Sequence, residues 1–341
     1  MTKRIILIAL AALTLIATGC KKKTQPIDEP VKVEVELSIT GAPEEAVLVG
    51  EKLTLTLKCN TDKVDLTTAE WSSTNTEIAK VNNSGHVLAV GMGVCEISAV
   101  IGEHSASVAI SVNERDPSKD QMGHVGEGKT TNGRDNSRML FQVGDSGYAG
   151  EIWHQGGANL LTYYENGTFI ASWSGPNDFL VGVGYYYGEQ GTSLDGKEYN
   201  CYFKHDKLGS GGGYNYICVH GWMVNPLIEF FIIDDWYNKP SAGILGQRKG
   251  EVTVDGDTYE IWQNTRVNQP SILGTKTFPQ YYSVRKNPRQ SGRIHVSTHF
   301  NNWARVGMTL GKLYDLRYYV EVGGGSGLLD CTYLFMSDGQ I

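Results

Sequence analysis

The sequence lacks the features that mark several large classes of protein. Its 341 residues carry 30 Lys and Arg against 37 Asp and Glu, and no stretch combines basic side chains with interleaved aromatics. Nucleic acid is therefore not an expected partner. Its 8 histidines and 6 cysteines follow no zinc-ligand spacing, so neither a metal nor another cofactor is expected. Helical periodicity of the apolar residues is almost absent, which predicts an all-β protein.

The N-terminal apolar run, residues 5–16, is too short to span a bilayer as a permanent helix. Lys3 and Arg4 precede this run and small residues follow it, which is the layout of a secretory signal. The residues Ala17-Thr18-Gly19-Cys20 resemble the bacterial lipobox. That resemblance implies that Cys20 becomes the lipidated first residue of the mature protein.

These features predict a lipoprotein signal peptide over residues 1–19 and a polar tether over residues 20–30. The lipid anchor implies a location in the bacterial cell envelope, at the outer membrane. The sequence leaves open whether the anchored protein faces outward or into the periplasm. An ordinary signal peptide followed by an incidental cysteine is the alternative.

Five cysteines remain if Cys20 carries lipid, so at least one thiol is unpaired in a monomer. Export permits disulfides, and the candidate pairs are Cys59 with Cys95 and Cys201 with Cys218. The alternative, that all of them are small buried side chains, stays open.

The first domain is expected over residues 31–113, where apolar and polar residues alternate between closely spaced turns, as in a β-sandwich. The motif Trp71-Ser72-Ser73-Thr74-Asn75 and the glycines that follow it resemble the bacterial Ig-like group 2 domain. That resemblance implies a spacer or adhesive module. The polar, Gly-rich residues 114–146 are predicted to form a linker.

The second domain, residues 147–341, is dense in Tyr, Trp and Gly and alternates again. Glu229 lies in an apolar strand-like run at residues 226–236, and Glu321 lies in a similar run at residues 318–322. Burying an isolated glutamate in such a strand is costly unless the side chain faces a polar cleft or a partner. Paired carboxylates are the equipment of a glycosidase, although ion-paired structural acids are common.

Several motifs of this domain resemble, in order and spacing, those of the glycoside hydrolase family 11 xylanases. Pro226-Leu227-Ile228-Glu229 is similar to the nucleophile strand, and Glu321 ahead of a Gly/Ser run is similar to the acid/base strand. Further colinear motifs lie at residues 280–285, 299–303 and 307–311. The resemblance implies a β-jelly roll of two curved antiparallel sheets around a long cleft, and an endo-acting β-1,4-xylanase that cleaves xylan with retention.

By this resemblance Glu229 is the nucleophile, and Glu321 protonates the leaving oxygen and then activates water. An Asp at position 178 goes with an acidic pH optimum, because a proton shared with Glu321 is lost as pH rises. The substrate-binding positions implied by the resemblance are Trp153, Asp178, His220, Phe231, Arg266, Pro270 and Gln280. The protein is expected to act on xylan or xylo-oligosaccharides as a monomer.

The sequence also departs from the family. Two tyrosines that usually flank the nucleophile are replaced by His220 and Phe231, and the tyrosine before the acid/base falls at Asp315 or, with a one-residue shift, at Tyr314. Lost hydrogen bonds of this kind slow turnover without abolishing it. Two alternatives therefore remain: a weakly active or non-catalytic xylan-binding lipoprotein, and a retaining β-1,4-endoglucanase.

Overall fold

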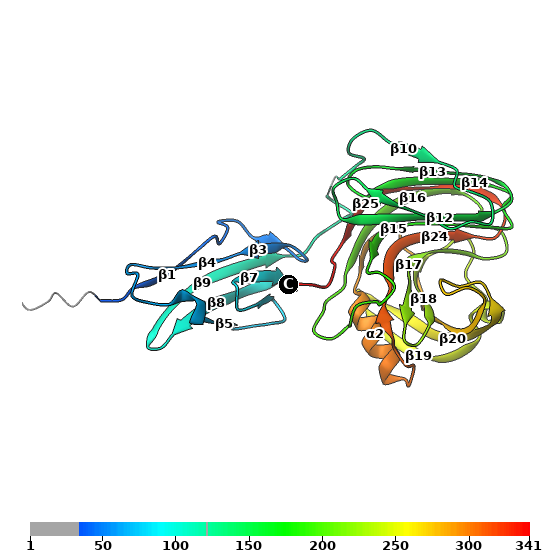
Figure 1. Ribbon diagram of the computed structural model, residues 1–341. Coiled ribbons are helices and arrows are strands. Elements are labelled where there is room, and N and C mark those ends of the chain that lie inside the picture. The colour runs from blue at the N-terminus through cyan, green and yellow to red at the C-terminus, as the bar shows by residue number, and fades with distance from the viewer. Residues whose placement is uncertain (1–33, 121) are drawn as a thin grey trace, which may run out of the picture.

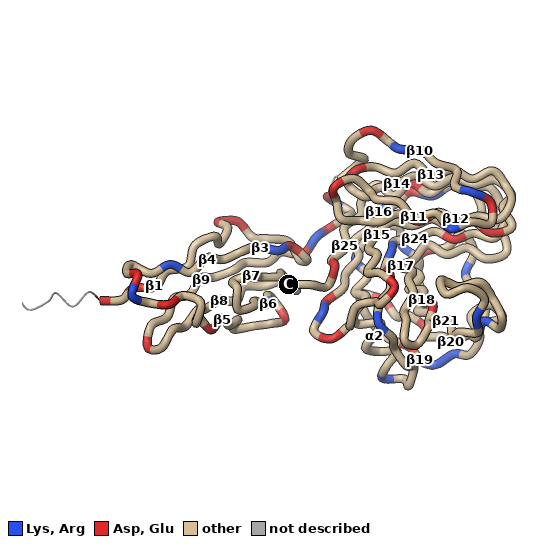
Figure 2. Tube along the Cα trace, viewed as in Figure 1, with Lys and Arg blue, Asp and Glu red and all other residues tan. Residues whose placement is uncertain are grey.

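The computed structural model describes residues 34–120 and 122–341. The predicted signal peptide, tether and lipidation site Cys20 lie outside these residues. Two β-rich domains follow each other along the chain (Figure 1). Acidic and basic residues intersperse over both of them (Figure 2). Within the described ranges, no helix has the length and apolar character needed to cross a membrane.

The N-terminal domain is the predicted Ig-like sandwich. Its sheets have the strand orders β2-β9-β8-β5, β3-β7-β6 and β1-β4. The strands are β1 (Leu37–Thr40), β2 (Val47–Leu48), β3 (Lys52–Thr54), β4 (Thr56–Cys59), β5 (Glu70–Ser73), β6 (Ala79–Val81), β7 (His86–Ala89), β8 (Gly93–Ile101) and β9 (His104–Asn113), with a 3-10 turn at Leu66–Thr68. Alternate residues of β8, such as Cys95, Ile97 and Ala99, point into the core, as the period of two requires.

The C-terminal domain is the predicted jelly roll of two curved sheets (Figure 1). The smaller sheet has the strand order β10-β13-β14-β25-β16-β22. The larger sheet runs β11-β12-β15-β24-β17-β18-β21-β20-β19, and β23 pairs with β17. All pairs in these sheets are antiparallel except β18 with β21.

The elements of this domain are β10 (Lys129–Thr131), β11 (Met139–Val143), β12 (Tyr148–Gln155), β13 (Ala158–Tyr163), β14 (Phe169–Ser174), β15 (Asp178–Tyr186), β16 (Cys201–Gly209), β17 (Asn215–Val224), β18 (Ile228–Asp235), α1 (Ala242–Leu245), β19 (Gln247–Val254), β20 (Asp257–Gln269), β21 (Lys276–Arg285), β22 (Ser291–Ile294), α2 (Val296–Arg305), β23 (Lys312–Leu313), β24 (Asp315–Val322) and β25 (Ser326–Met336).

Strand β18 shows how the sequence separates the two faces of the larger sheet. Phe230 and Ile232 enter the main core between the two sheets. Phe231 and Ile233 join a separate aromatic cluster on the opposite face. Because successive side chains of a strand alternate, Glu229 shares the face of Phe231 and stays out of the main core.

The segment at residues 114–146, predicted as a linker, does more than connect the domains. Strand β10 pairs with β13, and β11 pairs with β12, so this segment supplies one edge strand to each sheet of the second domain. Both strands are short edge strands: β10 is polar throughout, and in β11 the consecutive apolar residues Met139, Leu140 and Phe141 do not alternate with polar ones. This is why the sequence pattern did not reveal them.

The candidate disulfides are not formed. The five cysteines that the structure describes are all free thiols, and four of them are buried. Cys201, Cys218 and Cys331 are fully buried in the C-terminal domain, where they pack as small apolar side chains.

Candidate active site

A cavity of about 210 Å³ lies on the face of the larger sheet that carries Glu229. Its walls come from β12, β15, β17, β18, β20, β21 and β24, from Arg138 just before β11 and from the turn between β20 and β21. The lining residues are Arg138, Glu151, Trp153, Asp178, Leu180, His220, Trp222, Glu229, Arg266, Pro270, Ser271, Ile272, Phe278, Gln280, Tyr319 and Glu321. Both glutamates singled out in the sequence therefore face one cavity.

The Glu229 carboxylate is fixed by neighbours on both sides. Gln280 lies next to it on the parallel strand β21 and donates from Nε2 to Glu229 Oε2 at 2.6 Å. Tyr282 donates its hydroxyl proton to Gln280 Oε1 at 2.8 Å, which aims the Gln280 amide N–H at the carboxylate. On the other side, His220 Nε2 lies 3.2 Å from Glu229 Oε1. These contacts leave the carboxylate partly open to the cavity, with its side chain 14% exposed.

Glu321 and Asp178 both hold protons more tightly than carboxyl groups in water do. Desolvation in the cleft raises the pKa of Glu321 well above its ordinary value, and the charges of Asp178 and Glu229 raise it further. Desolvation also raises the pKa of Asp178 from 3.8 to about 6. Its Oδ1 atom is buried without a hydrogen-bond partner. The cavity therefore contains two carboxyl groups with raised pKa values beside Glu229, whose carboxylate accepts a hydrogen bond from Gln280.

A network of four charged side chains supports one wall of the cavity. Arg138, just before β11, forms a paired contact with Glu151, with Nε–Oε1 at 2.7 Å and Nη2–Oε2 at 2.9 Å. Its Nη2 also donates to Asp315 at 3.1 Å, and buried Arg317 contacts both acids through Nη1. Burial alone would raise the pKa of Glu151, but the positive charges of Arg317 and Arg138 outweigh it and lower the pKa to about 2.

Asp315 fills the place where a tyrosine was expected. It points inward, and its Oδ1 accepts a hydrogen bond from the backbone N–H of Trp222 at 2.7 Å. Tyr314 lies next to it and joins an apolar cluster with Trp222 and Phe278. The Arg138 guanidinium lies 5.8 Å from the centre of the Tyr314 ring. The Tyr314 phenol thus remains beside the network, where its hydroxyl accepts a hydrogen bond from Arg138 Nη1 at 3.4 Å.

The remaining predicted substrate-binding residues occupy the rims of the cavity. Trp153 lies on β12 beside Leu180 of β15. Arg266 lies near the end of β20, and Pro270 begins the turn that leads to β21. In this turn Ser271 Oγ donates to the carbonyl of Gly274 at 2.6 Å, which closes the tip.

Phe231 is the exception among the predicted substrate-binding residues. It is 1% exposed and does not line the cavity. Its ring stacks on Tyr282 with centroids 5.0 Å apart and lies 4.7 Å from the His220 ring. Phe231 therefore packs against Tyr282 and His220, two residues that position Glu229, and does not line the cleft itself.

The sequence analysis named Asp315 only as a departure from the family and did not identify Arg138, Glu151 and Arg317, the other members of the charged network. Glu151 lies two residues before Trp153, and Arg317 lies four residues before Glu321, so alternation alone places each on the cavity face. Arg138 gave no comparable signal, because it belongs to the segment interpreted as a linker.

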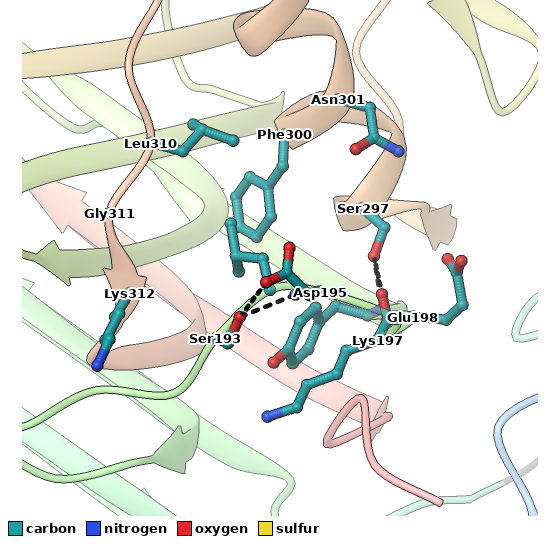
Figure 3. Close-up of a pocket in the computed structure, with 13 residues that line it drawn as sticks. Ser193, Asp195, Lys197, Glu198, Ser297, Phe300, Asn301, Leu310, Gly311 and Lys312 are labelled. Carbon is teal, nitrogen blue, oxygen red and sulfur yellow. Dashed lines mark hydrogen bonds between the residues drawn. The ribbon is translucent and has the colours of Figure 1, made fainter.

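A second cavity, of about 460 Å³, lies outside this cleft between the loop after β15 and helix α2 (Figure 3). Its polar side chains are engaged with one another: Ser193 donates to Asp195 at 2.8 Å, and Ser297 donates to the carbonyl of Lys197 at 3.3 Å. The hydrogen bond from His295 lowers the pKa of Glu198 in this cavity, which is the opposite of the shift at Glu321. We therefore assign the candidate active site to the smaller cavity. Across the described ranges, no three His, Cys, Asp or Glu side chains cluster as metal ligands.

Comparison with known families divides the chain as the fold does. The model of glycosyl hydrolases family 11 matches residues 145–332. The model of the bacterial Ig-like domain (group 2) matches residues 35–112.

Individual relatives agree with this division. Endo-1,4-beta-xylanase C of Fibrobacter succinogenes is 56% identical over 223 residues, which are 65% of this chain and 37% of that protein. Endo-1,4-beta-xylanase S20 of Neocallimastix patriciarum is 41% identical over 197 residues, or 56% of this chain and 58% of that protein. This chain thus spans less than two thirds of either relative. The crystal structure of wild-type ENZbleach xylanase superposes with a TM-score of 0.61 at 35% identity, covering 65% of this chain and 91% of that one.

Proposed function

This chain belongs to the glycosyl hydrolases family 11, and from that premise we propose that it is an endo-1,4-β-xylanase acting with retention. One observation carries the proposal: Glu229, held by Gln280 and His220, faces the same cavity as Glu321, whose pKa is raised. A retaining glycosidase needs this division between an ionised nucleophile and a protonated acid. The similarity to proteins named as endo-1,4-beta-xylanases supports xylan as the substrate.

In the first step, a carboxylate oxygen of Glu229 attacks the anomeric carbon of the xylose unit, and Glu321 gives its proton to the departing glycosidic oxygen. The products are a glycosyl ester on Glu229 and a shortened chain with a free hydroxyl. Ester formation removes the negative charge of Glu229. That charge helps to raise the pKa of Glu321, so Glu321 is a stronger acid once the ester has formed.

In the second step, Glu321 takes a proton from water as the water oxygen attacks the anomeric carbon. The bond to Glu229 breaks, the sugar leaves with its original configuration, and both carboxyl groups return to their starting states. Gln280 and His220 hold the Glu229 carboxylate through both steps, and Tyr282 holds Gln280. Positioning of this kind lowers the entropic part of the barrier.

The test is the release of reducing ends from xylan by the purified chain. We expect release from xylan, none from carboxymethylcellulose, and loss of release in Glu229→Gln. Glu189→Gln, which changes an exposed glutamate of the same domain, is the matched control and keeps full activity. Xylan binding without release by the unmodified protein would overturn the proposal, and release from carboxymethylcellulose would favour an endoglucanase.

We further propose that the protein is anchored in the bacterial envelope by lipid on Cys20 and acts as a monomer. The residues around Cys20 support the anchor. The first described strand, β1, lies at the end of the Ig-like domain farthest from the catalytic domain, so an anchor at that end leaves the cleft clear of the membrane (Figure 1). Replacement of Cys20 by Ala is expected to move the protein from the membrane fraction to the soluble fraction.

A further inference from the structure

The two domains share an apolar contact. Tyr202 of β16 and Tyr333 of β25 belong to the catalytic domain, yet they are buried in the core cluster of the Ig-like domain together with Val49 and Val112. Phe335 packs against the same cluster. The neighbours Cys201, Phe203 and Leu334 instead enter the catalytic core. Alternation along β16 and β25 therefore directs one face of the smaller sheet at the Ig-like domain.

Arg115 closes this contact from the end of the Ig-like domain. Its guanidinium lies 3.5 Å from the centre of the Phe335 ring, a cation–π contact between the domains. Arg115 is 9% exposed, and its Nε donates to the Val49 carbonyl at 2.9 Å. At Gly50 an added Cβ would meet Phe335 at 2.6 Å, so the ring lies directly on the Ig-like backbone.

Ion pairs surround the apolar contact. Lys52 pairs with Asp338 at 2.8 Å, and Lys80 pairs with Glu198 at 3.6 Å. At a third point the acid is on the Ig-like side: Glu114 accepts a hydrogen bond from the Tyr202 hydroxyl and pairs with Arg293 at 3.0 Å. Opposite charges thus meet at three separated points, which fixes the orientation of one domain on the other.

The contact at Lys80 reaches the second cavity of the catalytic domain. Lys80 Nζ donates to the Gly196 carbonyl at 3.2 Å, and Gly196 belongs to the loop that walls this cavity. On its other side the same loop is held by Ser297 of α2 (Figure 3). The Ig-like domain therefore adds a contact from a second side to a catalytic-domain loop that is also held by Ser297, Ser337 and Leu313.

The C-terminal tail crosses between the domains as well (Figure 1). Ser337 donates to the Glu198 carbonyl at 2.9 Å, within the catalytic domain, and Asp338 pairs with Lys52 of the Ig-like domain. Ile341 ends in a shallow hollow lined by residues of β3 and β7.

From these contacts we propose that the Ig-like domain is a docked brace of the catalytic domain, and that the two form one rigid unit. Domains joined only by a linker move freely relative to each other, whereas a buried apolar contact with a complementary charged rim prevents such motion. The brace stabilises β25 and the tail, and it holds the cleft at a fixed orientation to the N-terminal end of the molecule. This role is independent of the chemistry in the cleft.

Calorimetry of the full chain tests the proposal through Arg115→Ala, Phe335→Ala and the double variant. We expect one cooperative transition in the unmodified protein and a decrease in Tm of about 2–6 °C for each single change. The double variant should lose less than the sum, because both changes remove the same contact. Lys58→Ala, on β4, and Leu208→Ala, a 70% exposed apolar residue on β16, are the controls and should leave Tm within about 1 °C.

Hydrogen exchange measured by mass spectrometry locates the effect. In Arg115→Ala, amides of residues 331–337 should exchange faster although the change is in the other domain, while those of β18 stay as they were. Two separate transitions in the unmodified chain, additive losses in the double variant, or unchanged exchange at residues 331–337 would each overturn the proposal.

Discussion

His220 lies beside Glu229, the proposed nucleophile, at a position where family 11 xylanases usually have a tyrosine. Its Nε2 lies 3.2 Å from Glu229, its ring stacks on Tyr319 with centroids 4.3 Å apart, and its Nδ1 is buried without a hydrogen-bond partner. A proton on Nε2 makes His220 a donor to Glu229 in the neutral state, as a phenol would be. His220 is therefore a positioning residue that retains the donor which the missing tyrosine would have supplied.

Removing this donor should slow catalysis. A hydrogen bond to a charged group contributes about 1.5–3 kcal/mol, so His220→Phe should lower kcat on xylan about 10- to 100-fold with a smaller change in KM. His220→Tyr keeps a donor and should retain most of kcat. Steady-state kinetics with circular dichroism as a check on folding would measure this. An unchanged kcat in His220→Phe would show that the contact is not used.

We expect Asp178 to set the pH range of the reaction through its influence on Glu321. Its pKa of about 6 means that it is neutral, and able to donate a hydrogen bond, only below that pH. An asparagine amide donates at every pH. Asp178→Asn should therefore move the activity optimum to higher pH in a pH–rate profile of kcat/KM. A profile that does not move would contradict proton sharing between Asp178 and Glu321.

The same residue links pH to stability. A carboxyl whose folded-state pKa is raised holds its proton more tightly when folded, so the protein loses stability as pH rises from about 4 through about 6. Asp178→Asn removes this loss. Its free energy of unfolding should exceed that of the unmodified protein by about 1–2 kcal/mol at pH 8 and converge with it below pH 4. Urea unfolding at the two pH values measures both limits, and an equal difference at both would contradict the linkage.

At the scale of elements, strand alternation made part of the site predictable. The immediate strand neighbours of Glu229 and Glu321 are apolar, so alternation predicted that each glutamate points to the opposite face of the sheet from these neighbours. It could not show that β18 and β24 lie on the two sides of β17, because register and strand order depend on contacts far apart in sequence. The supporting role of Phe231 was hidden for the same reason: its covering partner Tyr282 comes from another strand.

The segment before β11 is the element whose contribution was least visible. It places Arg138 within hydrogen-bond distance of two buried acids, Glu151, which is 4% exposed, and Asp315, which is 0% exposed. Removing one partner from a buried ion pair leaves the other charge buried without a compensating charge, which is strongly destabilising. The strength of this wall therefore depends on a short polar stretch with no apolar pattern of its own.

Arg138→Met should lower the free energy of unfolding by about 2–4 kcal/mol, because Arg317 alone then balances Glu151 and Asp315. Arg134→Met, which changes an exposed arginine four residues earlier, is the matched control and should lie within about 0.5 kcal/mol of the unmodified protein. Chemical denaturation followed by tryptophan fluorescence gives both values. Equal effects of the two changes would mean that the network adds no stability.

At the scale of the whole molecule, the sequence predicted two β domains but not their docking. Both fold types follow from local alternation and turn residues. The contact of Arg115 with Phe335 joins residues 220 positions apart and has no local pattern. Residues 114–146 were predicted to form a linker, whereas residues 114 and 115 belong to the contact between the domains.

The central claim for the molecule is that Glu229 and Glu321 cleave xylan by double displacement. Proton NMR of the first product formed from a xylo-oligosaccharide tests this claim most directly, because the anomer is recorded before mutarotation. We expect the β anomer to appear first and no product to form with Glu229→Gln. Initial appearance of the α anomer would contradict the roles given to both glutamates.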